Sequence, residues 1–282
     1  MANIINQMKI NLQLRGYSPK TQEAYIGYIK RFSNYYDKPF EELGTKEIRR
    51  YLYYIQIIKK YSDSYINQNY SALKFLYKTV LHQEWSVEKY PRLRKNKKLP
   101  VVLSKSEVKD IFSAITNFKH KTILTTIYSA GLRISEAANL TIEDIDSKNM
   151  QIRVKQGKGK KDRYTILSKS NLQILREYWR IYKPGYYLFP GRSYKKPISP
   201  RSIQKYFKKT IKKAGITKHA TVHTLRHCFA THLLESGVDT YHIQNLMGHS
   251  SPKTTSIYIH LTRKDILSVI SPLDILMDDP ND

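Results

Sequence analysis

The stretch from His223 to Tyr258 limits the possible folds most, because helix start and stop signals divide it into short helices. Thr221 can cap a helix that starts near His223, and Gly237 is a favourable C-terminal stop. We therefore predict a helix from about His223 to Gly237, followed closely by two more.

The two following helices are shorter. One is predicted from Asp239 to Met247 and stops at Gly248. Ser251 and Pro252 form the pattern of an N-cap with proline at the first helical position, so they open the next helix. That helix carries Tyr258 about two turns later.

Helical spacing brings several polar side chains of this stretch together. His223, Arg226 and His227 are separated by three and four residues, so they share one helix face. His249 follows the second predicted helix, and Tyr258 lies on the third. Imidazole, guanidinium and phenol groups suit an oxyanion such as phosphate, with the phenol available as a nucleophile.

The charge of the chain favours a polyanionic partner. Among 282 residues, 49 are lysine or arginine and 23 are aspartate or glutamate, so the net charge is +26. Nucleic acid is the simplest such partner, and a basic membrane-surface protein is the alternative. No segment has the apolar length that crosses a bilayer, and the N-terminus lacks the apolar core of a signal peptide. The expectation is a soluble cytoplasmic protein without a membrane partner.

Cysteine usage limits the metal and disulfide chemistry that we expect. Cys228 is the single cysteine, which excludes an internal disulfide and argues against a thiolate zinc site. We expect no metal and no cofactor, because guanidinium groups can do at a phosphate what divalent ions do elsewhere; the scarcity of cysteine and the lack of a carboxylate cluster agree with this.

Residues 1–88 are predicted to form a helical bundle. Ser18 and Pro19 open one helix, and apolar side chains recur at helical spacing along the segment. Lysine and arginine occupy the opposite faces. Either this is a small solvated bundle or it is a module that clamps DNA, and the charge of the chain favours the clamp.

Residues 89–103 are predicted to be a basic linker. Two prolines bracket a run of cations that keeps the segment extended. A charge run is often only solvated, but here a strap along a phosphate backbone is at least equally favoured. The cations assigned to DNA contact are Arg92, Arg94, Lys95, Lys97 and Lys98.

A second domain is predicted from 104 to 282, with helices in its first part. Ser104 and Glu107 form a capping box at its start. After a helix that ends at Gly131, Arg133 lies among apolar residues, where a buried guanidinium needs a partner. Glu136 is the intrachain candidate and a phosphate the functional one, and the two are compatible.

A β-hairpin follows, from a strand at 150–154 to a strand at 164–167. Lys158 and Lys160 lie in its long glycine-containing turn. Local sequence gives equal weight to a polar hairpin tip and to an arm that delivers Lys158 into a site or groove. Ser199 and Pro200 open a basic helix that either crosses a DNA groove, with Arg201 and Lys205 as contacts, or is a charged outer face. The fold class predicted is mainly α with a small antiparallel β-sheet, α+β.

Four segments together resemble the tyrosine recombinases, also called the phage integrase family. The order of unrelated residue types in the last two segments is the most specific part of the resemblance. The segments are Ala130-Gly-Leu-Arg133-Ile-Ser-Glu136, Gly157-Lys158-Gly159, His223-Thr-Leu-Arg226-His227 with Ala230-Thr-His232, and Leu246-Met-Gly248-His249 with Thr254, Thr255, Tyr258 and His260.

The resemblance covers nearly the whole chain and implies a helical core-binding domain, a linker and a catalytic domain. It implies site-specific recombination through a 3′-phosphotyrosine, in DNA integration, excision or resolution. Tyr258 is the implied nucleophile and His223 the implied base, while His227 and His232 are expected to be structural. The implied catalytic residues are Arg133, Lys158, His223, Arg226, His249 and Tyr258. The length resembles the compact Xer-like and transposon integrase-resolvase type.

Partners and alternatives follow from the same resemblance. The implied partner is double-stranded DNA with inverted-repeat core sites, bound by a homotetramer that is a monomer when free, with room for accessory proteins. A C-terminal tail from about 263 is expected to dock on a neighbouring subunit. The setting is bacterial or archaeal, at the nucleoid. The alternatives are a type IB topoisomerase-like strand relaxase and a catalytically silent DNA-binding regulator of the same fold.

Overall fold

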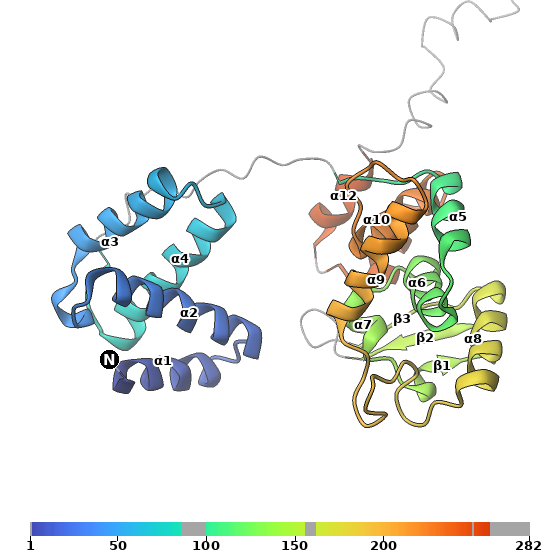
Figure 1. Cartoon of the computed structure of the whole chain (residues 1–282), viewed down its shortest axis with the longest axis horizontal. Coiled ribbons are helices and arrows are strands. Elements are labelled where there is room, and N and C mark those ends of the chain that lie inside the picture. The colour runs from blue at the N-terminus through green and yellow to red at the C-terminus, as the bar shows by residue number, and fades with distance from the viewer. Residues whose placement is uncertain (1, 86–99, 156–161, 250, 260–282) are drawn as a thin grey trace, which may run out of the picture. The chain divides into compact units, whose positions relative to one another are not determined.

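The computed structural model describes residues 2–85, 100–155, 162–249 and 251–259. The chain divides into two compact units, Met1–Lys97 and Lys98–Asp282, whose helices and strands are labelled in Figure 1. In the part of the chain that is described, no helix combines the length and the apolar character needed to cross a membrane.

The first unit is helical. Its elements are α1 (Ala2–Leu14), α2 (Pro19–Tyr36), the 3-10 turn η1 (Phe40–Glu42), α3 (Thr45–Tyr53) with the π-helical turn η2 (Tyr54–Ile58), and α4 (Asp63–Phe75) with the π-helical turn η3 (Leu76–Val80). The predicted start of α2 is confirmed, because the Ser18 side chain accepts a hydrogen bond from the Thr21 N–H and Pro19 follows it. Leu12, Ile29 and Phe32 are among the fully buried side chains that hold these helices together.

The second unit contains helices and one small sheet. Its elements are α5 (Lys105–Ala114), α6 (Phe118–Ala130), α7 (Ile134–Ala138), the 3-10 turn η5 (Ile142–Asp144), β1 (Ile145–Asp146), β2 (Gln151–Val154), β3 (Arg163–Ile166), α8 (Lys169–Tyr182), α9 (Pro200–Lys213), α10 (Val222–Leu234), α11 (Thr240–Met247) and α12 (Pro252–Ile259). This arrangement confirms the predicted class, mainly α with a small antiparallel sheet.

The sheet has the strand order β1-β2-β3, and both pairings are antiparallel. The expected hairpin is its β2–β3 part, in which Ile152 pairs with Thr165 and Val154 with Arg163. Alternation along β2 buries Ile152 and Val154 and exposes Gln151 and Arg153. The register therefore places Arg163 at the inner end of β3, close to α11, which packs on that strand.

Helix α6 lies at the centre of the second unit, packed against both α10 and α8 (Figure 1). Its Ile123, Leu124 and Ile127 side chains are fully buried. The packing fixes the end of α6 against α10, and residues that the sequence predicts to be catalytic lie around this end.

One helix was predicted to extend too far at its C-terminal end. Helix α10 ends at Leu234, not at Gly237. Gly237 has a left-handed backbone conformation, with a φ of 86°, and it turns the chain away from the helix axis. The Val238 N–H donates to the Leu233 carbonyl at 3.1 Å, so Gly237 lies inside the capping turn that follows the helix and is not part of the helix. The predicted domain limits, 1–88, 89–103 and 104–282, stay a prediction, since most of the linker lies outside the described residues.

Candidate active site

The turn after α6 places Arg133 on the inner side of the second unit. Gly131 ends α6 with a φ of 61°, and a Cβ at this position would lie 2.4 Å from the ring of Phe229. Glycine therefore serves both the left-handed backbone and the close approach of α6 to α10. Arg133 follows as the N-cap residue of α7, and its N–H donates to the Glu136 carboxylate at 2.8 Å.

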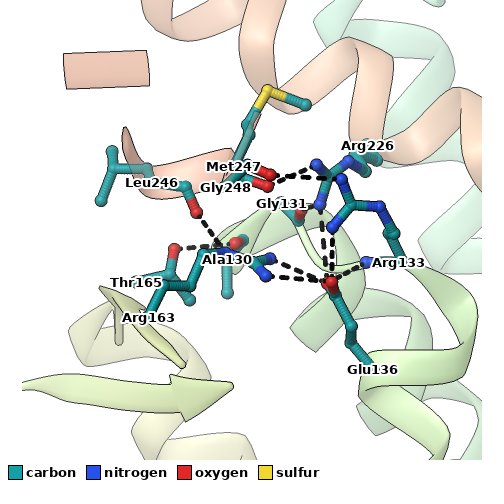
Figure 2. A network of polar contacts seen from close by, with 10 residues as sticks. All are labelled: Ala130, Gly131, Arg133, Glu136, Arg163, Thr165, Arg226, Leu246, Met247 and Gly248. Carbon is teal, nitrogen blue, oxygen red and sulfur yellow. Dashed lines mark hydrogen bonds and ion pairs between the residues drawn. The ribbon is translucent and has the colours of Figure 1, made fainter. Parts of the chain in front are cut away.

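The Glu136 carboxylate lies among three guanidiniums (Figure 2). Its Oε1 is 2.6 Å from Nη1 of Arg133 and 2.9 Å from Nη1 of Arg163. Its Oε2 is 2.8 Å from Nη2 of Arg163 and 3.6 Å from Nη1 of Arg226. Burial would raise the pKa of Glu136, but the hydrogen bonds and charge of Arg163, joined by Arg133, lower it to about 2. Glu136 thus stays ionised and offsets the mutual repulsion of the cations.

The same guanidiniums also hold the C-terminal end of α11. Each donates to one of three successive main-chain carbonyls, which no helical N–H can reach at a helix end. The pairs are Arg163 Nε to Leu246 O at 3.0 Å, Arg226 Nη2 to Met247 O at 2.6 Å and Arg133 Nη2 to Gly248 O at 3.4 Å. Cations are favourable there because the helix dipole is negative at that end. The cluster is therefore fixed from two sides, by a carboxylate and by a helix terminus.

Arg226 is the most deeply placed of these cations, with 1% of its side chain exposed. Its Nη1 also donates to the Gly131 carbonyl at 2.5 Å. Burial lowers the pKa of Arg226 to about 9, helped by Arg133 and opposed by Glu136. The side chain consequently remains charged at neutral pH, next to Arg133, whose side chain is 22% exposed.

His249 follows Gly248, which ends α11 with a φ of 61°. Its Nδ1 lies 2.9 Å from the Thr255 hydroxyl on α12, and its carbonyl accepts from the Gln244 side chain at 3.2 Å. Burial and then the charge of Arg226 lower the pKa of His249 to about 3. His249 is therefore a neutral hydrogen-bonding group here, tied to both helices that flank it.

Tyr258 is buried on α12, with 3% of its surface exposed. Its ring is stacked on that of His249, with centroids 6.4 Å apart and planes at 12°. Its hydroxyl lies 2.9 Å from Nδ1 of His227. Burial raises the pKa of Tyr258 to about 12, although Arg226 and Arg133 act in the opposite direction. The phenol is therefore protonated at rest and in the electrostatic range of both guanidiniums.

The two histidines of α10 that precede and follow Arg226 have different surroundings. His223 is exposed, whereas His227 is partly buried beneath Tyr258. Their rings meet edge to face with centroids 4.6 Å apart. Desolvation by neighbouring atoms and the charges of Arg226 and Arg133 lower the pKa of His223. Of the two imidazoles, only His227 reaches the phenol within the described structure.

The second unit thus brings together five of the six residues expected to be catalytic, namely Arg133, His223, Arg226, His249 and Tyr258. Lys158 lies outside the described residues, as do Lys160 and the linker cations Arg92, Arg94, Lys95, Lys97 and Lys98. Arg201 and Lys205 are exposed on α9, and they take no part in the cluster.

Sequence reasoning missed Arg163 and did not identify the contact between His227 and Tyr258. Nothing in local spacing marks Arg163, because its carboxylate partner is 27 residues away. His227 was expected to be structural, packed and hydrogen-bonded, and its hydrogen-bond partner is the Tyr258 hydroxyl. His232 does have structural contacts, to the Tyr128 hydroxyl at 2.9 Å and the Leu103 carbonyl at 3.0 Å. Among the residues described, no group of three or more His, Cys, Asp or Glu side chains is arranged to hold a metal ion.

Two family models match the sequence. Residues 101–265 match the phage integrase family, and residues 4–87 match the phage integrase N-terminal SAM-like domain.

Several proteins are similar to the chain over nearly its whole length. A putative integrase/recombinase, y4qK, of Sinorhizobium fredii is 39% identical over 277 residues, covering 98% of this chain and 90% of the relative. Tyrosine recombinase XerA of Pyrococcus horikoshii is 35% identical over 281 residues, covering 98% and 95%.

Two solved structures of recombinases are also similar to the chain. The crystal structure of XerA recombinase is 28% identical, covers 94% of this chain and 96% of its own, and superposes with a TM-score of 0.56. A lambda integrase dimer bound to a COC′ core site shares the fold, with a TM-score of 0.74 at 21% identity, covering 92% of this chain and 94% of its own.

Proposed function

The chain belongs to the phage integrase family of tyrosine recombinases and is a site-specific DNA recombinase, and we propose that Tyr258 is the nucleophile of its strand cleavage. The observation that carries this proposal is the position of the phenol. The Tyr258 ring is stacked on that of His249, and its hydroxyl is hydrogen-bonded to Nδ1 of His227. The charges of Arg226 and Arg133 act on the phenol and oppose the rise of its pKa. No other tyrosine in the described ranges shares that surrounding.

In the proposed reaction, the Tyr258 oxygen attacks a DNA phosphorus and forms an O–P bond as the bond to the 5′-oxygen breaks. A 3′-phosphotyrosine and a free 5′-hydroxyl result, and a hydroxyl from a partner strand reverses the step. The phosphodiester energy is kept in the protein–DNA bond, so rejoining needs no nucleotide cofactor. Lys158 is proposed to protonate the leaving 5′-oxygen.

Arg133, Arg226 and His249 are proposed to donate to the non-bridging oxygens of the transition state. Removing one such donor typically costs about a hundred- to thousand-fold in rate. This proposal is supported by the contacts that already hold both guanidiniums in place, namely those with Glu136 and with the end of α11. Little reorganisation is then needed when charge develops on the phosphate. His223, exposed beside them, is proposed as a further polar contact of the phosphate.

We propose double-stranded DNA with inverted-repeat core sites as the partner. The net charge of +26 supports it, as do the exposed Arg201 and Lys205 on α9. The linker cations and Lys160 are proposed as further backbone contacts. We propose a free monomer that forms a tetramer on two DNA sites, with the tail from about 263 docking on a neighbour, acting in the cytoplasm at the nucleoid. Light scattering of the chain alone and with its bound duplex would test the assembly.

The test of the nucleophile is covalent trapping. Duplexes of random sequence are enriched by repeated binding to the protein, nicked near the centre, incubated with it and resolved in SDS. Wild type should give a DNA-linked band, and Tyr258→Phe should give none. Tyr241→Phe is the matched control, because Tyr241 is exposed on the adjacent helix α11 and its loss should leave the band unchanged. A band that persists in Tyr258→Phe would refute the assignment.

Relaxation of supercoiled plasmid and binding without chemistry are the alternative activities. Both relatives described above are named integrase or recombinase, which gives neither alternative support. Joining of two differently labelled duplexes by wild type would distinguish recombination from relaxation.

A further inference from the structure

The Tyr258 hydroxyl has one hydrogen-bond partner in the described structure, Nδ1 of His227 at 2.9 Å. His227 is the residue directly after Arg226 and lies one helical turn beyond His223. His223 is exposed, and neither of its ring nitrogens bonds to another described residue. The geometry separates two neighbouring imidazoles, one beneath the nucleophile and one open to solvent.

The surroundings of His227 keep it neutral. Burial lowers the pKa of His227 to about 4, and the adjacent His223 and Arg226 act in the same direction. A neutral imidazole has one acceptor nitrogen and one N–H. With Nδ1 as the acceptor, the phenol points its proton at His227 and leaves its lone pairs free for another atom.

That orientation is the one an attack requires. An oxygen whose proton is already directed into a base can form a bond to phosphorus from its other side. The ring of Tyr258 is additionally held by its stacking on His249. Rotation of the hydroxyl is thereby restricted by a hydrogen bond and movement of the ring by packing.

We propose that His227, not His223, positions the Tyr258 hydroxyl and takes its proton during cleavage, an inference that rests on the proposed function of Tyr258. As the phenolic O–P bond forms, the O–H bond breaks and the proton passes to Nδ1 of His227. The bond from phosphorus to the 5′-oxygen breaks with its electron pair, and the leaving oxygen takes a proton from the general acid, Lys158 in our proposal. In rejoining, the imidazolium of His227 returns its proton to the phenol. His223 is left to contact the phosphate.

The test compares equivalent substitutions at the two histidines. An asparagine side chain can present its oxygen near the former Nδ1, so His227→Asn keeps an acceptor but loses the base. With the enriched nicked duplex, His227→Asn should slow formation of the covalent band by about a hundred-fold or more, within the usual range for general acid–base catalysis. His227→Ala, which also loses the acceptor, should be slower still. Circular dichroism of each variant checks that the fold is kept.

Rescue distinguishes proton transfer from a purely structural role. Incorporation of 3,5-difluorotyrosine at 258 lowers the pKa of the phenol and so reduces the need for a base. Relative to its effect in wild type, the fluorinated tyrosine should raise the rate of covalent-band formation in His227→Asn by at least about ten-fold. It should not raise that rate in the control His223→Asn. A packing defect at 227 would show no such selective rescue.

Three outcomes would overturn the proposal while wild type still forms its covalent band. The first is that His227→Asn forms the covalent band at a rate close to that of wild type. The second is that His227→Asn forms the band faster than wild type, which would mean that the hydrogen bond slows cleavage. The third is that the fluorinated tyrosine rescues His223→Asn as well as it rescues His227→Asn. Absence of a band with wild type would instead contradict the proposed function itself. Nitrogen-15 spectra of histidine-labelled chain provide a check without DNA, because Tyr258→Phe should shift Nδ1 of His227 and leave His223 nearly unchanged.

Discussion

Replacing Glu136 with glutamine should destabilise the second unit strongly. The substitution keeps the shape of the side chain and one acceptor oxygen, but removes the charge that faces Arg133, Arg163 and Arg226. Three guanidiniums would then share a buried site without a counterion. Removing one partner of a buried ion pair typically costs about 3–5 kcal/mol.

The pKa of Glu136 indicates a similar cost in free energy of unfolding. It is lowered from 4.5 to about 2 by Arg163 and Arg133 against the effect of burial. At 1.36 kcal/mol for each pKa unit, that difference corresponds to about 3 kcal/mol of preference for the charged form. The carboxylate is only 7% exposed, so solvent screening reduces this value little.

Glu107→Gln is a closely matched control. Glu107 is also the third residue of its helix and also accepts from an N-cap N–H, that of Ser104 at 2.7 Å. Its cation is Lys218, which is 45% exposed. Glutamine preserves such a capping contact, and an exposed ion pair is worth about 1 kcal/mol or less. The control should therefore lose far less stability than Glu136→Gln.

Native-state hydrogen exchange on the whole chain, followed by mass spectrometry, measures the difference. The most protected peptides of α6 and α10 should lose about 3 kcal/mol of opening free energy in Glu136→Gln, while peptides of α2 and α4 in the first unit should not change. Equal losses in Glu136→Gln and Glu107→Gln would refute the view that a buried charge holds the arginine cluster.

Three further outcomes follow from the same contacts. Because the folded-state pKa of Glu136 is lowered, its contribution is present above about pH 4.5 and lost as pH falls toward 2; in urea titrations, wild type should lose about 3 kcal/mol more than Glu136→Gln over that interval. Gly131→Ala should cost clearly more unfolding free energy in urea than Gly215→Ala, since both have positive φ but only the former would place a Cβ against Phe229, and equal costs would contradict this. Arg163→Lys should slow covalent trapping by about ten-fold or more, because lysine cannot hold the Glu136 carboxylate at two points while also reaching α11, and an unchanged rate would show that this support is dispensable.

Local signals in the sequence were sufficient for most helix ends. Ser104 with Glu107 marks the start of α5, and Asp239 with Gly248 marks both ends of α11, as the structure has them. These signals work because a cap is made by residues within four positions of each other. The end of α10 was misplaced by three residues, since Gly237 closes the turn without being part of the helix.

The cluster of side chains around Glu136 and Tyr258 was only partly predictable. The order of arginine, histidine and tyrosine along the chain pointed to a phosphate-directed site, and Glu136 was foreseen as a partner of Arg133 because it is three residues away. That Arg163 joins them could not be foreseen, because this depends on the β2–β3 register that places it beside α11.

By itself the sequence determined the class of the fold, the family and the chemical groups available, since helix caps, hydrophobic periodicity and motif order are local properties. Only the tertiary structure decided which groups meet. Arg133 reaches the carbonyl of Gly248 across 115 positions, and the helix face that carries His223 and His227 does not show which imidazole meets Tyr258. The packing of α12 on α10 places the Tyr258 hydroxyl within hydrogen-bonding distance of His227, and no local signal in the sequence predicts that contact.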